Sequence, residues 1–206
     1  MGMRIRKKWD LPSEQGAALL VLALSFLAGG LAGCILAALS NGIGAEELGK
    51  YLLDYLSLAE EESLPRDPWP LVWNQIKYLL AALLLGITAL GLAGLPILFG
   101  VRGFFFSFPV ACFFRVFGAR GLFPAFILFG LSALLWAPAL FAAGVPGFLF
   151  ARRLLRQALG EGRSELTFHG SWLCRAGLCV GLALAAGLLE YWVVPVLLQA
   201  AARVIL

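Results

Sequence analysis

The stretch that decides the fold is Gly86–Gly144, which reads GITALGLAGLPILFGVRGFFFSFPVACFFRVFGARGLFPAFILFGLSALLWAPALFAAG. It lies within an apolar run, 79–150, whose charged residues are Arg102, Arg115 and Arg120. A soluble domain cannot cover so long an apolar sequence with water-facing residues, whereas a helix of ~20 apolar residues spans the hydrocarbon of a bilayer. The sequence therefore predicts an integral membrane protein.

The composition agrees with this interpretation. Of the 206 residues, 61% are hydrophobic and 14% are charged, and the mean hydropathy is +0.90. The formal charge of +4 lies mostly at the ends of apolar runs, which indicates membrane orientation rather than nucleic-acid binding. The four cysteines lie in apolar runs without a C-x-x-C pair and are expected to be small packing residues: Cys34, Cys112, Cys174 and Cys179.

The first apolar segment, 16–39, follows a basic flank that contains Arg4, Arg6, Lys7 and Lys8. Residues 31–34, Leu-Ala-Gly-Cys, match the lipobox of bacterial lipoproteins, but the apolar sequence continues to Leu39 and leaves no polar tether. We therefore expect an uncleaved first span. Gly29 and Gly33 form a G-x-x-x-G pair on it, which permits close approach of another helix.

The segment 40–70 is polar and mainly acidic. Apolar residues recur in it at helical spacing, which predicts an amphipathic helix at the outer membrane face, ended by a proline cluster. Two interpretations remain open: a docking surface for an extracytoplasmic partner, or a lid that packs on the bundle or lies in the interface. The candidate docking residues are Glu47, Asp54, Glu60 and Glu61.

Four further spans are expected at 71–99, 104–117, 122–150 and 176–198, with a cytoplasmic basic loop at 151–175. The run 104–117 has only 14 residues and would also suit a re-entrant segment. Charge favours a span, because five spans place 10 of the 16 basic residues inside, against 8 for the alternative. The expected helix-break or packing residues are Gly91, Gly94, Pro96, Gly103, Pro109, Pro138 and Pro195.

The predicted fold class is thus all-α: a polytopic helical integral membrane protein, one domain over 1–206, with about five transmembrane helices. The N-terminus is predicted to be cytoplasmic and the C-terminus outside. The cluster Arg152, Arg153 and Arg156 is interpreted as a topology signal, with lipid recognition as the alternative. His169, the single histidine, is interpreted as a surface residue.

Glu190 is the one acid inside an apolar run. A buried ionisable group costs ~3 kcal/mol near a helix centre, so a partner or a role is expected for it. At 1.5 Å per residue, Lys77 and Arg115 reach the same outer half of the bundle. We therefore expect an ion pair between Glu190 and Lys77 or Arg115 as a structural clasp, with a proton or substrate pathway as the alternative.

Several short motifs recur along the apolar runs: Gly86-Ile87-Thr88 to Gly91, Arg102-Gly103 followed by Phe108, Ala137-Pro138-Ala139-Leu140 to Gly144, the Arg152–Gln157 exit, and Glu190 followed by Pro195-Val196-Leu197-Leu198. In order and spacing they resemble the stage II sporulation protein M family. The resemblance covers nearly the whole chain. Family members often carry a polar group such as Asn or Glu about five residues or fewer before the proline that corresponds to Pro138. In the stretch 131–136 here, only Ser132 is polar.

The resemblance implies a multi-pass cytoplasmic-membrane scaffold of endospore-forming bacteria. It implies recruitment of two peptidoglycan hydrolases, an amidase/endopeptidase and a lytic transglycosylase, to the septal membrane, where peptidoglycan remodelling drives engulfment during sporulation. The expected partners are thus the phospholipid bilayer and these extracytoplasmic hydrolases, with a homo-oligomer possible. Nucleic acid is not an expected partner.

An enzyme is not expected, because the motifs that supply a nucleophile, base or metal ligand at a fixed spacing do not occur, and no cofactor or metal is expected. The alternative function is a small transporter or permease subunit that uses broken helices and the intramembrane Glu190, although no internal repeat is evident. Production at sporulation rather than in vegetative growth would distinguish the scaffold from the transporter.

Overall fold

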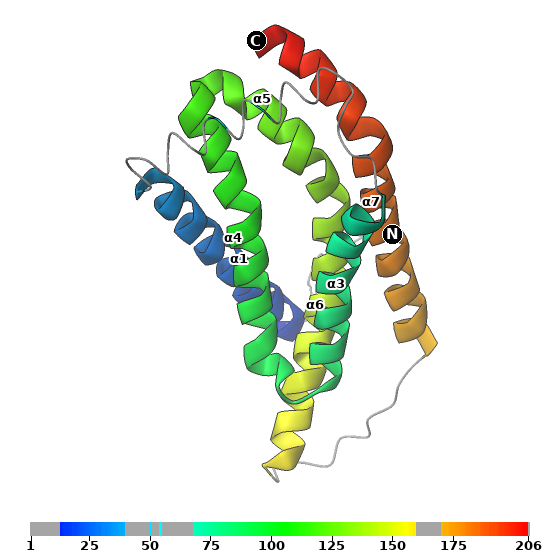
Figure 1. Ribbon diagram of the computed structural model, residues 1–206. Coiled ribbons are helices and arrows are strands. Elements are labelled where there is room, and N and C mark those ends of the chain that lie inside the picture. Colours follow the sequence, from blue (N-terminus) through cyan, green and yellow to red (C-terminus); the bar gives the residue numbers. More distant parts are fainter. Residues whose placement is uncertain (1–12, 40–49, 51–53, 55–67, 160–169, 206) are drawn as a thin grey trace, which may run out of the picture.

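The computed structural model describes residues 13–39, 50, 54, 68–159 and 170–205, and every structural statement below concerns these residues. Five helices of 20 residues or more make up the described chain (Figure 1): α1 (Ser13–Leu39), α3 (Pro68–Ile87), α4 (Gly91–Phe117), α6 (Leu131–Ala158) and α7 (Gly170–Ile205). Three short elements join α4 to α6: η1 (Gly118–Gly121), α5 (Leu122–Ala125) and η2 (Phe126–Gly130), a π-helical turn.

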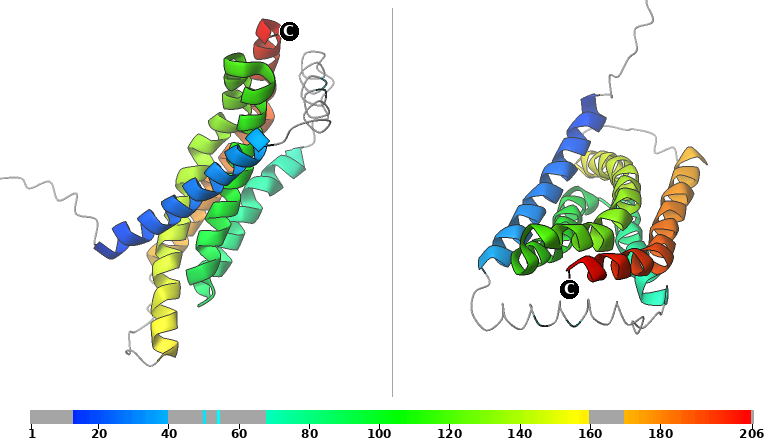
Figure 2. Two further views of the ribbon diagram at one scale, coloured as in Figure 1. Left: turned by 90° about the vertical axis from the view of Figure 1, so that its left-hand side faces the viewer. Right: turned by 90° about the horizontal axis from the view of Figure 1, so that it is seen from above.

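The five long helices form one bundle in which each helix runs opposite to the one before it (Figure 1). Seen from above, α1 and α7 lie on opposite sides, with α3, α4 and α6 between them (Figure 2). The helix α1 crosses α4 obliquely, and α7 packs on α3 and α6. This alternation agrees with the predicted all-α, five-helix layout.

Three described stretches are long and apolar enough to cross a membrane, namely Glu14–Leu39, Gly91–Ala158 and Ala176–Val194, and a shorter apolar helix covers Val72–Ile87. The second stretch has 68 residues, far more than the ~20 that one span needs. The chain reverses within it at Gly118, where φ is +62°, so α4 and α6 form two arms of one hairpin. The architecture is that of a multi-pass membrane protein.

The surface of α1 shows what surrounds the bundle. Leu20, Leu24, Leu27 and Leu31 are each 56–64% exposed and follow one another at helical spacing. On a water-soluble protein such a stripe would be an aggregation-prone patch, whereas in a bilayer it is the face that contacts acyl chains. The polar side chains Gln75 and Ser132 are buried instead, at 8% and 4% exposure.

Glycine brings α1 and α4 into backbone contact. A Cβ on Gly29 would lie 1.8 Å from the carbonyl oxygen of Gly100, and one on Gly103 would lie 2.1 Å from that of Phe26. Any side chain at these positions would therefore push the two helices apart. The predicted close approach at the Gly29-x-x-x-Gly33 pair is confirmed, since Gly33 packs against the α4 backbone at Phe104. We call this contact the glycine seam.

The boundary between the second and third spans differs from the prediction. The chain turns at 88–90, not between 99 and 104, and α4 continues without a break through Arg102. Thr88 ends α3, since its Oγ1 donates to the carbonyl of Leu85 at 3.0 Å and its own carbonyl accepts from Gly91 N at 3.1 Å. A Cβ on Gly91 would lie 2.2 Å from the Leu85 oxygen, so this tight turn requires glycine.

The other expected helix breaks lie inside helices. Gly94, Pro96, Gly103 and Pro109 all belong to α4, Pro138 belongs to α6, and α7 runs through position 195. Proline is tolerated in a membrane helix when neighbouring helices and local adjustments satisfy the freed carbonyls. Among the expected residues, Gly91 does begin a helix, α4, and that helix ends before the positive-φ Gly118, which is not among them.

Candidate functional site

The most polar place within the bundle is a chain of three side chains from three helices. Arg102 of α4 donates from Nη2 to Oε1 of Gln75 on α3 at 2.7 Å. Gln75 in turn donates from Nε2 to Oε2 of Glu190 on α7 at 2.9 Å. One amide thus accepts from the cation and donates to the anion. We call Gln75, Arg102 and Glu190 the polar triad.

Two aromatic rings hold the Arg102 guanidinium in place. Its Cζ lies 4.1 Å from the ring centroid of Trp136 on α6 and 4.5 Å from that of Tyr78 on α3. Such contacts stabilise a desolvated cation, and more so for the planar guanidinium than for an ammonium. They explain how α4 carries a positive charge at its middle, about 16 Å from its first residue at 1.5 Å per residue.

The polar triad lines a cavity of about 370 Å³ between α3, α4, α6 and α7. Its polar wall also includes Lys77, Tyr78 and Ser132, and its apolar wall includes Phe105, Phe106 and Phe129. Lys77 and Asn74 are exposed, so the cavity opens between the early turns of α3 and its neighbours.

Toward the first residues of α4 the cavity is closed by the packed core. Leu95 and Phe99, which precede Arg102 by about two turns and one turn respectively, are fully buried. Phe99 contacts Phe141 edge-on at 4.8 Å between ring centroids. On α3, Ala82, which lies one turn after Tyr78, is also fully buried. The packed core therefore closes the cavity toward this end of the bundle.

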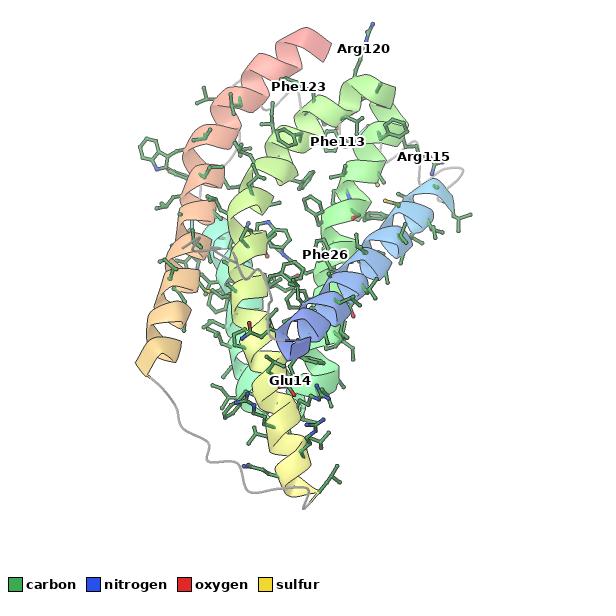
Figure 3. The ribbon with its side chains drawn as sticks, turned by 180° about the vertical axis from the view of Figure 1, so that it is seen from behind. Glu14, Phe26, Phe113, Arg115, Arg120 and Phe123 are labelled. Atoms are coloured by element: carbon green, nitrogen blue, oxygen red, sulfur yellow. The ribbon has the colours of Figure 1, made fainter. Side chains whose placement is uncertain are left out.

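The structure gives Glu190 other partners than the expected Lys77 and Arg115. Glu190 is hydrogen-bonded to Gln75, and Lys77 shares the cavity but has its Nζ over the Tyr78 ring, 5.1 Å from the centroid. Arg115 lies between three and four turns beyond Arg102 along α4, beside the end of α1 (Figure 3). The carboxylate is thus brought together with Arg102, through Gln75, and not with the two predicted cations.

Arg115 acts at the end of α1. Its Nη1 donates to the carbonyl oxygen of Ala37 at 2.5 Å and reaches that of Ala38 at 3.4 Å. These carbonyls belong to the last turn of α1, which lacks intrahelical partners and carries the negative end of the helix dipole. Arg115 therefore caps α1 and joins it to α4 beyond the glycine seam.

Among the docking candidates, Asp54 is exposed, whereas Glu47, Glu60 and Glu61 lie outside the described residues, as does His169. Cys112 and Cys179 are buried and fit the predicted packing role, whereas Cys34 is exposed. In the described part of the chain no three His, Cys, Asp or Glu residues gather as metal ligands.

Sequence reasoning missed Gln75 and Arg102 as members of the site. Gln75 and Asn74 are adjacent amides near the start of an apolar helix, and this local signal was available. Ser132, the polar residue of the stretch 131–136 before Pro138, is buried and lines the cavity. Its Oγ donates to the Phe129 carbonyl at 3.3 Å.

Comparison with known proteins agrees with this architecture. Residues 22–195 match a family model described as SpoIIM, stage II sporulation protein M, and the match extends from within α1 to within α7. It includes all three members of the polar triad. The chain has no match among curated proteins or among solved structures.

Proposed function

Since the chain belongs to the stage II sporulation protein M family, and is thereby a sporulation-related membrane protein, we propose that it is the membrane scaffold of a peptidoglycan-remodelling complex needed for engulfment. In this role it recruits extracytoplasmic wall hydrolases, an amidase/endopeptidase and a lytic transglycosylase, to the septal membrane. The observation that carries the proposal is the family match across all five long helices.

The bundle supports a scaffold by its mechanical character. The glycine seam, the Arg115 cap and the polar triad fix α1, α3, α4 and α7 relative to one another. Such a body holds the last residue of α1 and the first residue of α3, which flank the acidic segment 40–67, at constant places. Asp54, the described member of the docking set, is exposed and thus accessible to a partner.

The test is an affinity pull-down of the detergent-solubilised protein from sporulating cells. The test variant carries Glu47→Gln, Asp54→Asn, Glu60→Gln and Glu61→Gln. The matched control neutralises four acids on the predicted cytoplasmic side: Asp10→Asn, Glu14→Gln, Glu161→Gln and Glu165→Gln. We expect wall hydrolases to co-purify with the wild type and the control, and to be lost from the test variant. Absence of any wall hydrolase from the wild-type sample would contradict the proposal.

The predicted orientation is tested separately by cysteine labelling in a variant without the native cysteines. Ala89 in the α3–α4 turn and Arg120 in η1 are both exposed and lie at opposite ends of α4. With the N-terminus inside, a membrane-impermeant maleimide added to intact cells labels Arg120→Cys and spares Ala89→Cys. The reverse pattern would show that the N-terminus is outside.

The second candidate function is a small transporter or permease subunit. The observation that favours it is the cavity with Lys77, Arg102 and Glu190 among the membrane helices. Transport needs a path to both sides, and the packed core at Leu95 and Phe99 closes one of them in this structure. We therefore place the scaffold first, and production only at sporulation would support that order.

A further inference from the structure

The cavity is a candidate binding site in its own right. Its volume of about 370 Å³ falls in the range of small-molecule pockets, which is ~300–1,000 Å³. Its polar residues come from four different helices, so the site exists only in the folded bundle. This is independent of the scaffold role.

The charge of the cavity points to an anion. Lys77 and Arg102 contribute two positive charges and Glu190 one negative charge, which leaves one positive charge in excess. Gln75 already uses its amide oxygen and its amide nitrogen within the polar triad. A monoanion would neutralise the site.

Arg102 supplies unused hydrogen-bonding capacity. Its Nε is buried and has no hydrogen-bond partner among the described residues, although a buried donor left unpaired costs about 1–3 kcal/mol. The rings of Tyr78 and Trp136 lie within 4.5 Å of its Cζ and hold the guanidinium in place. A guanidinium held in this way recognises planar, two-oxygen acceptors such as a carboxylate.

The remaining walls define the rest of the ligand. Phe105 and Phe106, about one turn beyond Arg102 on α4, and Phe129 provide an apolar, aromatic surface beside the Arg102 cation. The mouth lies near Lys77, ~6 Å along the helix axis from Trp73. Trp73 and Trp69 are exposed and stacked, with ring centroids 6.4 Å apart, as expected of aromatics at the membrane interface. A compound with one anionic end and an apolar body therefore fits both walls and reaches the mouth.

We propose that the cavity binds an organic monocarboxylate, with its carboxylate against Arg102 and Lys77 and its apolar body against the phenylalanine wall. Two sources supply this chemistry: a small carboxylate from water, or a fatty acid from the membrane. Glu190 acts within the site by holding Gln75, which in turn orients Arg102.

The experiment measures binding of two radiolabelled probes, 4-phenylbutyrate and oleate, to the full-length protein in zwitterionic-lipid nanodiscs, with empty nanodiscs subtracted. Each probe has a neutral isostere, 4-phenylbutanamide or oleamide. We expect saturable binding of a carboxylate and not of its amide. Tighter binding of oleate identifies the membrane as the source, and tighter binding of 4-phenylbutyrate identifies water.

Three variants locate the site. Lys77→Gln removes a charge at the exposed mouth without touching the packed core, and Arg102→Lys keeps the charge but loses the planar fork. Each is expected to weaken binding roughly tenfold or more, the equivalent of ~1.4 kcal/mol. Arg120→Gln, an exposed charge outside the cavity, is the matched control and should stay within about twofold. Equal binding of amide and carboxylate, no saturable binding to the wild type, or unchanged binding by Lys77→Gln would overturn the proposal.

Discussion

Where α4 meets α1, glycines let the two backbones touch, whereas where α4 meets α3, α6 and α7 the interface is polar and leaves a cavity of about 370 Å³. Two consecutive residues mark the difference, since Gly103 packs against the α1 backbone and Arg102 belongs to the polar triad. Inside a bilayer an apolar side chain gains little free energy by exchanging acyl-chain contacts for contacts with another helix. Membrane helices therefore associate through close packing or through hydrogen bonds. One helix uses packing on one face and hydrogen bonds on the other.

The comparison predicts the largest loss of stability on the polar side when a single charge is removed. Arg102→Met leaves the half-buried Glu190 carboxylate without its cation. Breaking a fully buried pair costs about 3–5 kcal/mol, so for this half-buried pair we expect a loss near the lower end of that range. The loss is measured as the free energy of unfolding of the purified protein in mixed micelles. A loss no larger than that of an exposed-surface substitution would show that the polar triad does not hold the bundle.

A double-mutant cycle sharpens this prediction. Glu190→Gln alone should leave membrane insertion intact but weaken assembly. Combined with Arg102→Met, it should cost less than the two single losses together, by roughly 1–2 kcal/mol, because the second change removes the charge that the first left unpaired. The control pair, Arg102→Met with Arg115→Leu, should be additive within about 0.5 kcal/mol. Additivity in both pairs would rule out coupling through Gln75.

On the glycine seam a single methyl group should be enough to destabilise. The Cβ of Gly29→Ala would lie 1.8 Å from the Gly100 oxygen, so α1 and α4 must separate. Overpacking of this kind costs about 1–3 kcal/mol. The matched control is Gly181→Ala in α7, which meets nothing within 4 Å and should leave stability unchanged or slightly raised. Equal unfolding free energies for the two variants would contradict the close contact.

The smallest expected effect lies at the end of α1. Arg115→Leu removes the hydrogen bond to the Ala37 carbonyl and a favourable charge at the helix C-terminus, with an expected cost of about 1 kcal/mol. Arg115→Lys should retain part of the stabilisation, because a positive charge remains at the end of α1. Arg120→Leu, whose side chain points away from the bundle (Figure 3), should have almost no effect on the unfolding free energy.

Much of the fold was predictable from the sequence. The apolar runs gave the helix class and the alternating five-helix layout, and Gly29-x-x-x-Gly33 gave the face of α1 that another helix approaches. These features depend on local composition and spacing, because the length of an apolar run determines whether a helix spans the bilayer and small residues determine where helices approach closely. Orientation stays a prediction: with Arg102 among the membrane helices, nine rather than ten of the 16 basic residues remain on the expected cytoplasmic side.

The misplaced turn had one physical cause. Arg102 was assigned to the end of a span because a charge in hydrocarbon is costly, and its partners lie 27 and 88 positions away in the chain, where no local pattern reveals them. Span lengths carried the missing signal. The predicted spans had 29 and 14 residues, whereas a turn at 88–90 gives helices of 20 and 27 residues.

The wrong partners for Glu190 followed from the same error. The predicted span boundary puts Arg102 at a membrane surface, so the rise per residue leaves Lys77 and Arg115 as the cations expected at the depth of Glu190. Once α4 begins at Gly91, Arg102 lies near the middle of a 27-residue helix, at the level of Glu190 and Gln75. The tertiary arrangement supplies the partners that stabilise this charge, namely Gln75 and the rings of Tyr78 and Trp136.

The π-helical turn η2 determines which side chains of α6 face the cavity. One residue rotates a helix by about 100°, so the extra residue of a π turn sets the direction in which every later side chain leaves the axis. Ser132 and Trp136 lie in the two helical turns after Phe126–Gly130, and with the π turn present both side chains line the cavity. Loss of one residue from this turn would shorten the helix by only ~1.5 Å, a change a bilayer tolerates, yet it would rotate both side chains by more than a quarter turn. Membrane fit and cavity chemistry can therefore vary separately in this protein, through the length of a single turn.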